Sequence, residues 1–113
     1  MLARDAQSSQ IIKQGGMKNK YHDLINALMA DPRTKIFSES PDSITLGLSN
    51  MGGTTIFTLI QTFGSLTVQW KVDSPVFGKH KMDWSFQENH DQSAMIEKIE
   101  SDLLNYQNRV FKS

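Results

Sequence analysis

The chain has 113 residues, of which 38% are hydrophobic and 21% charged, and this length suits one domain with a single core. Its twelve lysines and arginines equal its twelve acidic residues, and the net charge of zero disfavours nucleic-acid binding, which usually needs a basic surface. The absence of cysteine excludes disulfides and cysteine-ligated zinc. No apolar run approaches the roughly 20 residues of a membrane span, so we expect a cytoplasmic protein with no membrane partner.

The first thirty residues divide into a polar arm and a helix. Residues 1–16 are mostly polar and end in Gly15-Gly16, so we expect a loose arm there and a single α+β domain over residues 17–113. Apolar residues then recur at positions 17, 21, 24, 25, 28 and 29, the spacing of one helical face. This pattern predicts a helix over residues 17–30, which ends before Pro32 because the residue preceding a proline avoids the helical region.

Two strands are predicted next. Residues 35–39 form a short extended run that contains Ile36 and Phe37, and residues 40–43 include the proline and aspartate of a turn. From residue 43 to residue 49 large apolar residues alternate with small ones, so that Ile44, Leu46 and Leu48 share one side. Such alternation is typical of a strand with one buried face.

The stretch from residue 54 to residue 73 is predicted to form a hairpin of two further strands. Gly64-Ser65 would be its two-residue turn, with glycine at the first central position of a type II′ turn. That turn sets a register in which Leu59 faces Trp70.

A fifth strand and a long helix complete the predicted elements. Residues 80–87 alternate between apolar and polar side chains. Asn89 is the predicted N-cap of the helix, with Gln92 three positions later as in a capping box. Apolar residues at positions 95, 96, 99, 103, 106 and 110 then predict a helix that continues to about residue 111.

Together these elements predict an α+β fold, a two-layer sandwich with the order α-β-β-β-β-β-α. Short connections favour a five-stranded antiparallel meander. Five strands at about 4.8 Å give a sheet about 24 Å wide, and two helices about 10 Å across would cover one face of it. The predicted sheet residues of the core are Phe37, Ile44, Leu46, Leu48, Phe57, Leu59, Phe63, Leu66, Val68, Trp70, Val72, Met82, Trp84 and Phe86.

No helix remains for the opposite face of the sheet. Its central residues are mostly threonine, with two isoleucines and with Lys71 as the only expected charge. Such a face is either a plain solvated surface or, because interface cores are poor in charge, the site of a face-to-face dimer or of another protein partner. The predicted interface residues are Ile56, Thr58, Ile60, Thr67 and Gln69.

A second candidate site lies on the helix-covered face. Gln61 is the only long polar residue on that side of the hairpin, and a buried amide needs a hydrogen-bond partner or an exit to the rim. Aromatic residues line many small-molecule sites, so Gln61, Trp70 and Trp84 define a possible pocket. The two tryptophans, expected to lie opposite each other, equally suit a core. A small-molecule-binding domain or minor enzyme is therefore the alternative function.

No motif indicates an enzyme, a cofactor or a metal. The chain has only three histidines, His22, His80 and His90, whereas a metal site needs three or four converging ligands. It contains neither a G-x-S-x-G elbow nor the glycine-rich phosphate-binding pattern. We therefore predict a binding or assembly module that acts through protein–protein contacts, as a homodimer through the open sheet face or an edge strand.

Overall fold

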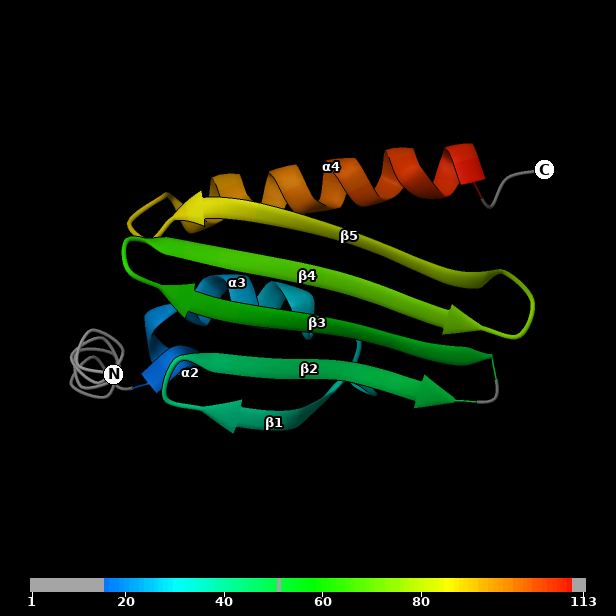
Figure 1. The fold of residues 1–113 in the computed structure, drawn as a ribbon, viewed down its shortest axis with the longest axis horizontal. Coiled ribbons are helices and arrows are strands. Elements are labelled where there is room, and N and C mark those ends of the chain that lie inside the picture. Colours follow the sequence, from blue (N-terminus) through cyan, green and yellow to red (C-terminus); the bar gives the residue numbers. More distant parts are fainter. Residues whose placement is uncertain (1–15, 51, 111–113) are drawn as a thin grey trace.

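A computed structural model describes residues 16–50 and 52–110 of the chain (Figure 1). The predicted arm lies outside the described residues, apart from Gly16. The described elements are helices α2 (Gly16–Lys20) and α3 (His22–Leu28), strands β1 (Lys35–Ser40), β2 (Ser43–Asn50), β3 (Gly53–Thr62), β4 (Ser65–Ser74) and β5 (Gly78–Gln87), and helix α4 (Gln92–Val110).

The five strands form one antiparallel sheet in the order β1-β2-β3-β4-β5. Each strand pairs with the next one along the chain, as a meander requires. The three described helices lie behind the sheet in Figure 1, and α4 runs along β5. The predicted α+β two-layer sandwich is therefore confirmed.

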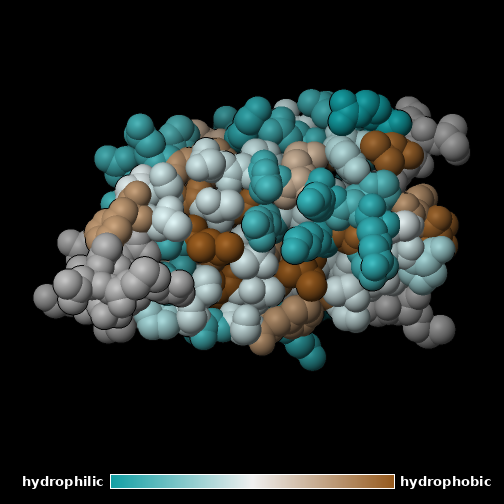
Figure 2. All heavy atoms as spheres, viewed as in Figure 1, coloured by the Kyte–Doolittle hydropathy of each residue, from teal (hydrophilic) through white to brown (hydrophobic). Residues whose placement is uncertain are grey.

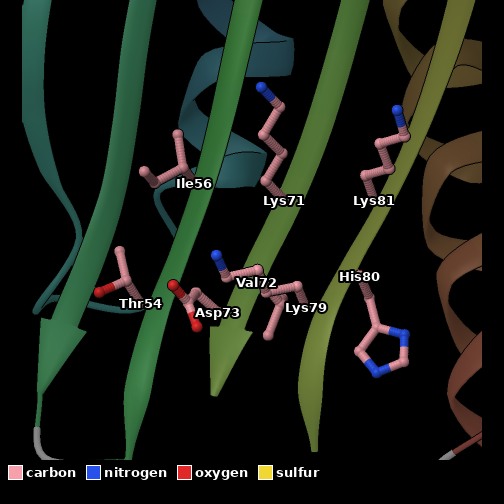
Figure 3. A pocket seen from close by; sticks show the side chains of 8 residues that line it. All are labelled: Thr54, Ile56, Lys71, Val72, Asp73, Lys79, His80 and Lys81. Carbon is pink, nitrogen blue, oxygen red and sulfur yellow. The ribbon is translucent and has the colours of Figure 1, made fainter. Parts of the chain in front are cut away.

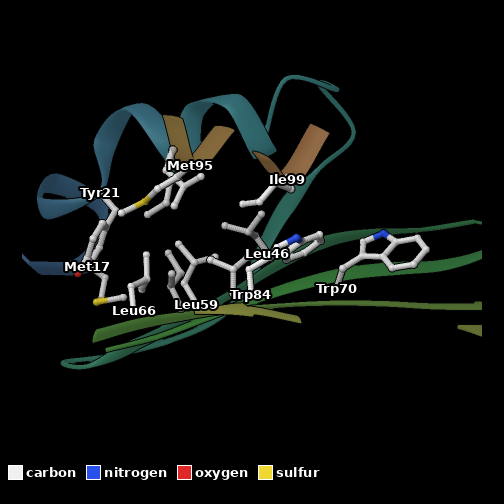
Figure 4. Close-up of a cluster of buried hydrophobic side chains, with 13 residues drawn as sticks. Met17, Tyr21, Leu46, Leu59, Leu66, Trp70, Trp84, Met95 and Ile99 are labelled. Atoms are coloured by element: carbon white, nitrogen blue, oxygen red, sulfur yellow. The ribbon is translucent and has the colours of Figure 1, made fainter. Parts of the chain in front are cut away.

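The core lies between the sheet and the helices (Figure 4). Its fully or almost fully buried hydrophobic residues are Ile44, Leu46, Leu59, Leu66, Val68, Trp70 and Trp84 from the sheet, and Met17, Tyr21, Leu24, Ile25, Met95 and Ile99 from the helices and the residue between α2 and α3. Phe57, Val72, Met82 and Phe86 are partly buried and pack against this cluster. Each buried side chain of this size contributes about 1.5–3 kcal/mol, so the covered face holds the fold together.

The β3–β4 hairpin has a different register from the predicted one. Thr62 pairs with Ser65, so the two loop residues are Phe63 and Gly64 rather than Gly64 and Ser65. Gly64 has a φ of 75° at the second loop position, where a type II turn needs a positive φ. The partner of Leu59 is therefore Val68, not Trp70. Because the shift is two residues, the side chains that remain in the two strands keep their predicted faces.

Two predicted core residues are instead exposed. Phe63 lies in the hairpin loop with 60% of its surface exposed. Phe37 lies where the β1–β2 pairing is interrupted, because Ile36 pairs with Leu46 while Ser38 pairs with Thr45, which leaves one extra residue in β1. Such a bulge removes its extra residue from the pairing, and Phe37 is 46% exposed.

The predicted first helix is broken at Tyr21. There the backbone has a φ of −114° and a ψ of 40°, and α2 ends while α3 begins. In a continuous helix the amide of Leu24 would donate to the carbonyl of Lys20. Instead the Leu24 amide donates to Oε1 of Gln92, and Nε2 of Gln92 donates to the Lys20 carbonyl, each at 3.0 Å. The side-chain amide of Gln92 thus replaces one helical hydrogen bond and joins α4 to the first helices.

Helix α4 begins later than predicted. Its first helical residue is Gln92, and the amide of Met95 donates to the carbonyl of Asp91 at 3.1 Å. Asp91 therefore occupies the capping position, and the prediction of Asn89 as the N-cap is wrong. Gln92 cannot close a capping box because its amide bonds to the backbone of α2 and α3.

Candidate functional site

The five predicted interface residues lie together on the face of the sheet that none of the described helices covers, here called the open face. Ile60 pairs with Thr67, and Thr58 pairs with Gln69. Ile56 is two residues before Thr58 on β3 and therefore lies on the same face. All five side chains are half-buried by their neighbours. The structure thus places the candidate residues in one contiguous surface on β3 and β4.

One end of this surface is poor in charge: five neighbouring side chains on β2, β3 and β4 are neutral, and Asp83 of β5, opposite Gln69, lies at their edge. We call Thr45, Thr58, Ile60, Thr67 and Gln69 the neutral patch. Thr45 pairs with Thr58 across β2 and β3, and their hydroxyl oxygens are 3.4 Å apart. In the view of Figure 2, which shows this face, pale and brown side chains extend over β2 and β3, whereas teal side chains gather over β4 and β5.

The other end of the open face is cationic. Lys71 pairs directly with Lys81 of β5, and Lys79 is two residues before Lys81 on the same face. The prediction that Lys71 is the only charge near the centre of this face is wrong, because the strand register brings Lys81 beside Lys71 and Asp83 beside Gln69. We call Lys71, Lys79 and Lys81 the lysine patch.

The open face is hollowed at the lysine patch. A depression of about 480 Å³ is lined by Thr54, Ile56, Lys71, Val72, Asp73, Lys79, His80 and Lys81. In Figure 3, Ile56 and the lysine side chains project in front of the strands, while the imidazole of His80 lies beyond β5, toward α4. In the lining of the hollow three lysines accompany one aspartate, Asp73, which pairs in register with Lys79. Asp83 follows Lys81 by two residues on the same face and lies outside this lining.

Gly47 of β2 leaves space beside the hollow on the open face. It pairs with Ile56, and a Cβ atom at this position would lie 2.2 Å from the carbonyl oxygen of Thr55. No side chain fits there without a backbone shift, so the face has no side chain beside Ile56 on β2.

Gln61, the first residue of the predicted pocket, is buried in a hydrogen-bond network. Its Oε1 accepts from the hydroxyl of Tyr21, and its Nε2 donates to the Thr62 carbonyl at 2.7 Å and to Glu88 at 3.1 Å. The Glu88 carboxylate also forms an ion pair of 3.1 Å with Lys20. Burial, with a further effect of the Glu88 charge, raises the pKa of Tyr21 well above its usual range. The amide therefore has the partners that a buried position requires.

The two tryptophans of the predicted pocket are both core residues. Trp70 pairs with Met82 and Trp84 with Val68, so they do not face each other as predicted. Trp70 packs edge-on against Tyr106 of α4, with ring centroids 5.6 Å apart.

Trp84 is also bonded to the helix layer. Its Nε1 donates to Asp102 at 2.8 Å, and this hydrogen bond, with a further effect of Lys98, lowers the pKa of the Asp102 carboxyl. This bond fixes α4 to β5.

A cavity between helices and sheet does exist at another place. It measures about 180 Å³ and is lined by Ala27, Leu28, Phe57, Ile96, Ile99, Glu100 and Leu103. Neither Gln61 nor a tryptophan belongs to this lining. The predicted pocket residues therefore do not define this cavity.

The histidines lie in separate environments. His80 Nε2 donates to the carbonyl of Phe77 at 2.6 Å, and in the neutral ring Nδ1 then accepts from the hydroxyl of Tyr106 at 2.7 Å. His22 is exposed beside Asp23, and His90 lies against the ring of Phe86. Within residues 16–50 and 52–110, no three metal-ligating side chains of the His, Cys, Asp or Glu type cluster together.

Among the described residues no helix has both the length and the apolar character needed to cross a membrane. Comparison of the chain with models of protein families, with curated proteins and with solved structures gave no match.

Proposed function

We propose that the protein is a small binding module that acts through protein–protein contacts and forms a homodimer through the neutral patch of its open face. The main support is the contiguity of Ile60, Thr58 and Thr67 on a sheet face that no described helix covers. Their cross-strand partners are uncharged, and Asp83, opposite Gln69, lies at the edge of the patch. Charge depletion is what distinguishes the core of a protein interface from the rest of a surface.

The size of the open face suits such a contact. Five strands about 4.8 Å apart and about nine residues long give a surface of about 24 by 30 Å, or roughly 700 Å². A specific interface of standard size buries about 800 Å² on each partner. A complete overlap of two copies of this face, packed as in a sheet-on-sheet sandwich, would approach that size, and a contact centred on the neutral patch would bury a smaller area.

Charge selects the orientation of the two copies. A two-fold axis along the strands would place the Lys71–Lys81 row of one copy over the same row of the other, and like charges at such short range oppose association. A two-fold axis across the strands, at the row of Ile60 and Thr67, moves the two lysine patches to opposite ends. In that arrangement the neutral patch faces itself, as a two-fold interface requires.

Sedimentation equilibrium of matched variants tests the proposal. We expect a dimer for the wild type and a monomer for Ile60→Asp, because a carboxylate at the centre of the contact would be buried without a partner. Leu104→Asp is the control, since Leu104 is an exposed apolar residue of α4, at 59% exposure. The Leu104→Asp variant should remain dimeric. If Ile60→Asp does not fold, Thr67→Arg serves as the second test of the same contact, and it should be monomeric.

A monomeric wild type would contradict the proposal. So would a dimer that Leu104→Asp weakens as much as Ile60→Asp does.

A further inference from the structure

We infer that the hollow at the lysine patch is a binding site for a small organic molecule that carries a phosphoryl group. The inference depends only on the cationic end of the open face and therefore stands apart from the proposed dimer. The residues that would contact the ligand are Thr54, Ile56, Lys71, Lys79 and Lys81.

Two lysines lie side by side at the hollow. Lys71 and Lys81 are direct cross-strand partners, and like charges in such a position destabilise a sheet. Within the described part of the chain, none of Lys71, Lys79 and Lys81 forms an ion pair with an acidic side chain. Asp73 and Asp83 flank the lysines on the same face, and neither forms an ion pair with them, so the ammonium groups of Lys71 and Lys81 can both donate to a bound anion.

The chemistry of the anion follows from the number of charges. A phosphate monoester carries about 1.5 to 2 negative charges at neutral pH and offers three acceptor oxygens, so one group can bridge both Lys71 and Lys81. A single carboxylate has one charge and would leave one ammonium uncompensated. Asp73 lies at the same hollow, opposite Lys79 in register, and its charge offsets one of the three positive charges without an ion pair.

The shape and the lining indicate the rest of the ligand. A volume of about 480 Å³ lies in the range of small-molecule sites, about 300–1,000 Å³. Ile56 gives the hollow an apolar side chain beside the lysines, and Thr54 contributes a hydroxyl group. No aromatic ring from the described residues other than the imidazole of His80, which points toward α4, lines the hollow, so a stacked nucleobase is not favoured.

Two ligands separate the contribution of the phosphoryl group from that of the organic part in an NMR titration of the ¹⁵N-labelled full chain at constant ionic strength. Inorganic phosphate should cause saturable shifts at the amides of Thr54, Ile56, Lys71 and Lys81. Phenyl phosphate should bind several-fold more tightly, because its ring can cover Ile56. The double variant Lys71→Gln with Lys81→Gln should weaken both ligands about tenfold or more, since each charge-assisted bond is lost.

Lys35→Gln is the matched control, because Lys35 lies on the same face in β1, opposite Gly47. It should leave both affinities unchanged. Repeating the titration with Ile60→Asp separates this site from the dimer, since the monomer should bind phosphate as well as the wild type does.

Linear shifts without saturation, shifts away from the hollow, or equal losses in Lys35→Gln and the double variant would overturn the inference. Phenyl phosphate binding no better than inorganic phosphate would overturn the assignment of an organic ligand.

Discussion

The two faces of the sheet treat polar groups in opposite ways. On the covered face each buried polar side chain has a specific partner, as Gln61 has in Tyr21 and Glu88, and as Trp84 has in Asp102. On the open face Lys71 and Lys81 lie side by side without an ion pair to a described residue. The covered face is therefore organised for stability, whereas the open face retains an arrangement that stability alone does not explain. This difference is the reason for placing function on the open face.

Adjacent residues on β3 give the sharpest test of this contrast. Leu59 is fully buried on the covered face, and Ile60 follows it on the open face. Leu59→Ala should lower the free energy of unfolding by about 2–5 kcal/mol, because a cavity forms in the core. Ile60→Ala should cost less than about 1 kcal/mol at dilutions where the protein is monomeric. Urea unfolding measures both, and equal losses would show that the two faces do not differ.

The next largest effect concerns the break between α2 and α3. Gln92→Ala should lower the free energy of unfolding by about 1–3 kcal/mol, since the Lys20 carbonyl and the Leu24 amide lose their partner. Gln87→Ala, at an exposed position of β5, should change the free energy of unfolding by less than about 0.5 kcal/mol. If Gln92→Ala were as stable as Gln87→Ala, the helices would not depend on this amide.

The buried phenol of Tyr21 should make the covered face sensitive to alkaline pH. Because its pKa is raised in the folded state, the unfolded chain releases this proton first as the pH rises above about 10. The contribution of Tyr21 to the free energy of unfolding should therefore be constant below that pH. Above it, the free energy of unfolding should fall by at most about 1.4 kcal/mol per pH unit. Tyr21→Phe should remove this part of the slope in unfolding curves between about pH 9 and pH 11. An unchanged slope would contradict the burial of a neutral phenol.

The smallest expected change in the free energy of unfolding is an increase. Lys71→Gln relieves the repulsion from Lys81 and should stabilise the protein by at most about 1 kcal/mol at low salt. The gain should shrink as salt is added, because exposed charges are screened. Lys35→Gln provides the comparison, and thermal unfolding at two salt concentrations is the measurement. Loss of stability in Lys71→Gln would mean that Lys71 has a favourable partner.

Periodicity was sufficient to predict the layers and the strand order, because alternation and helical spacing record which face of an element is buried. Register was harder, since Gly64 suits either of two turn positions and only packing decides between them. The break at Tyr21 could not be predicted either, because it depends on Gln92, which is 71 residues away in the chain.

The candidate surface was predictable in part for the same reason. Ile56 and Ile60 could be assigned to the uncovered face from alternation alone. The lysine patch could not be recognised in the same way, because it forms only when the β4–β5 register brings Lys71 beside Lys81. The sequence signal for this patch is a lysine at an outward position of each strand, which becomes visible only once the two strands are aligned in the correct register.

The most direct test of the proposed homodimer contact is a dilution series of the ¹⁵N-labelled protein observed by NMR. If the neutral patch is a homodimer contact, the amides of Thr58, Ile60, Thr67 and Gln69 should shift with concentration, while those on the outer side of α4 should not. The same series with Ile60→Asp should show no concentration dependence. Spectra of the wild type that do not change with concentration, or that change mainly at the helices, would contradict the assignment of function to the open face.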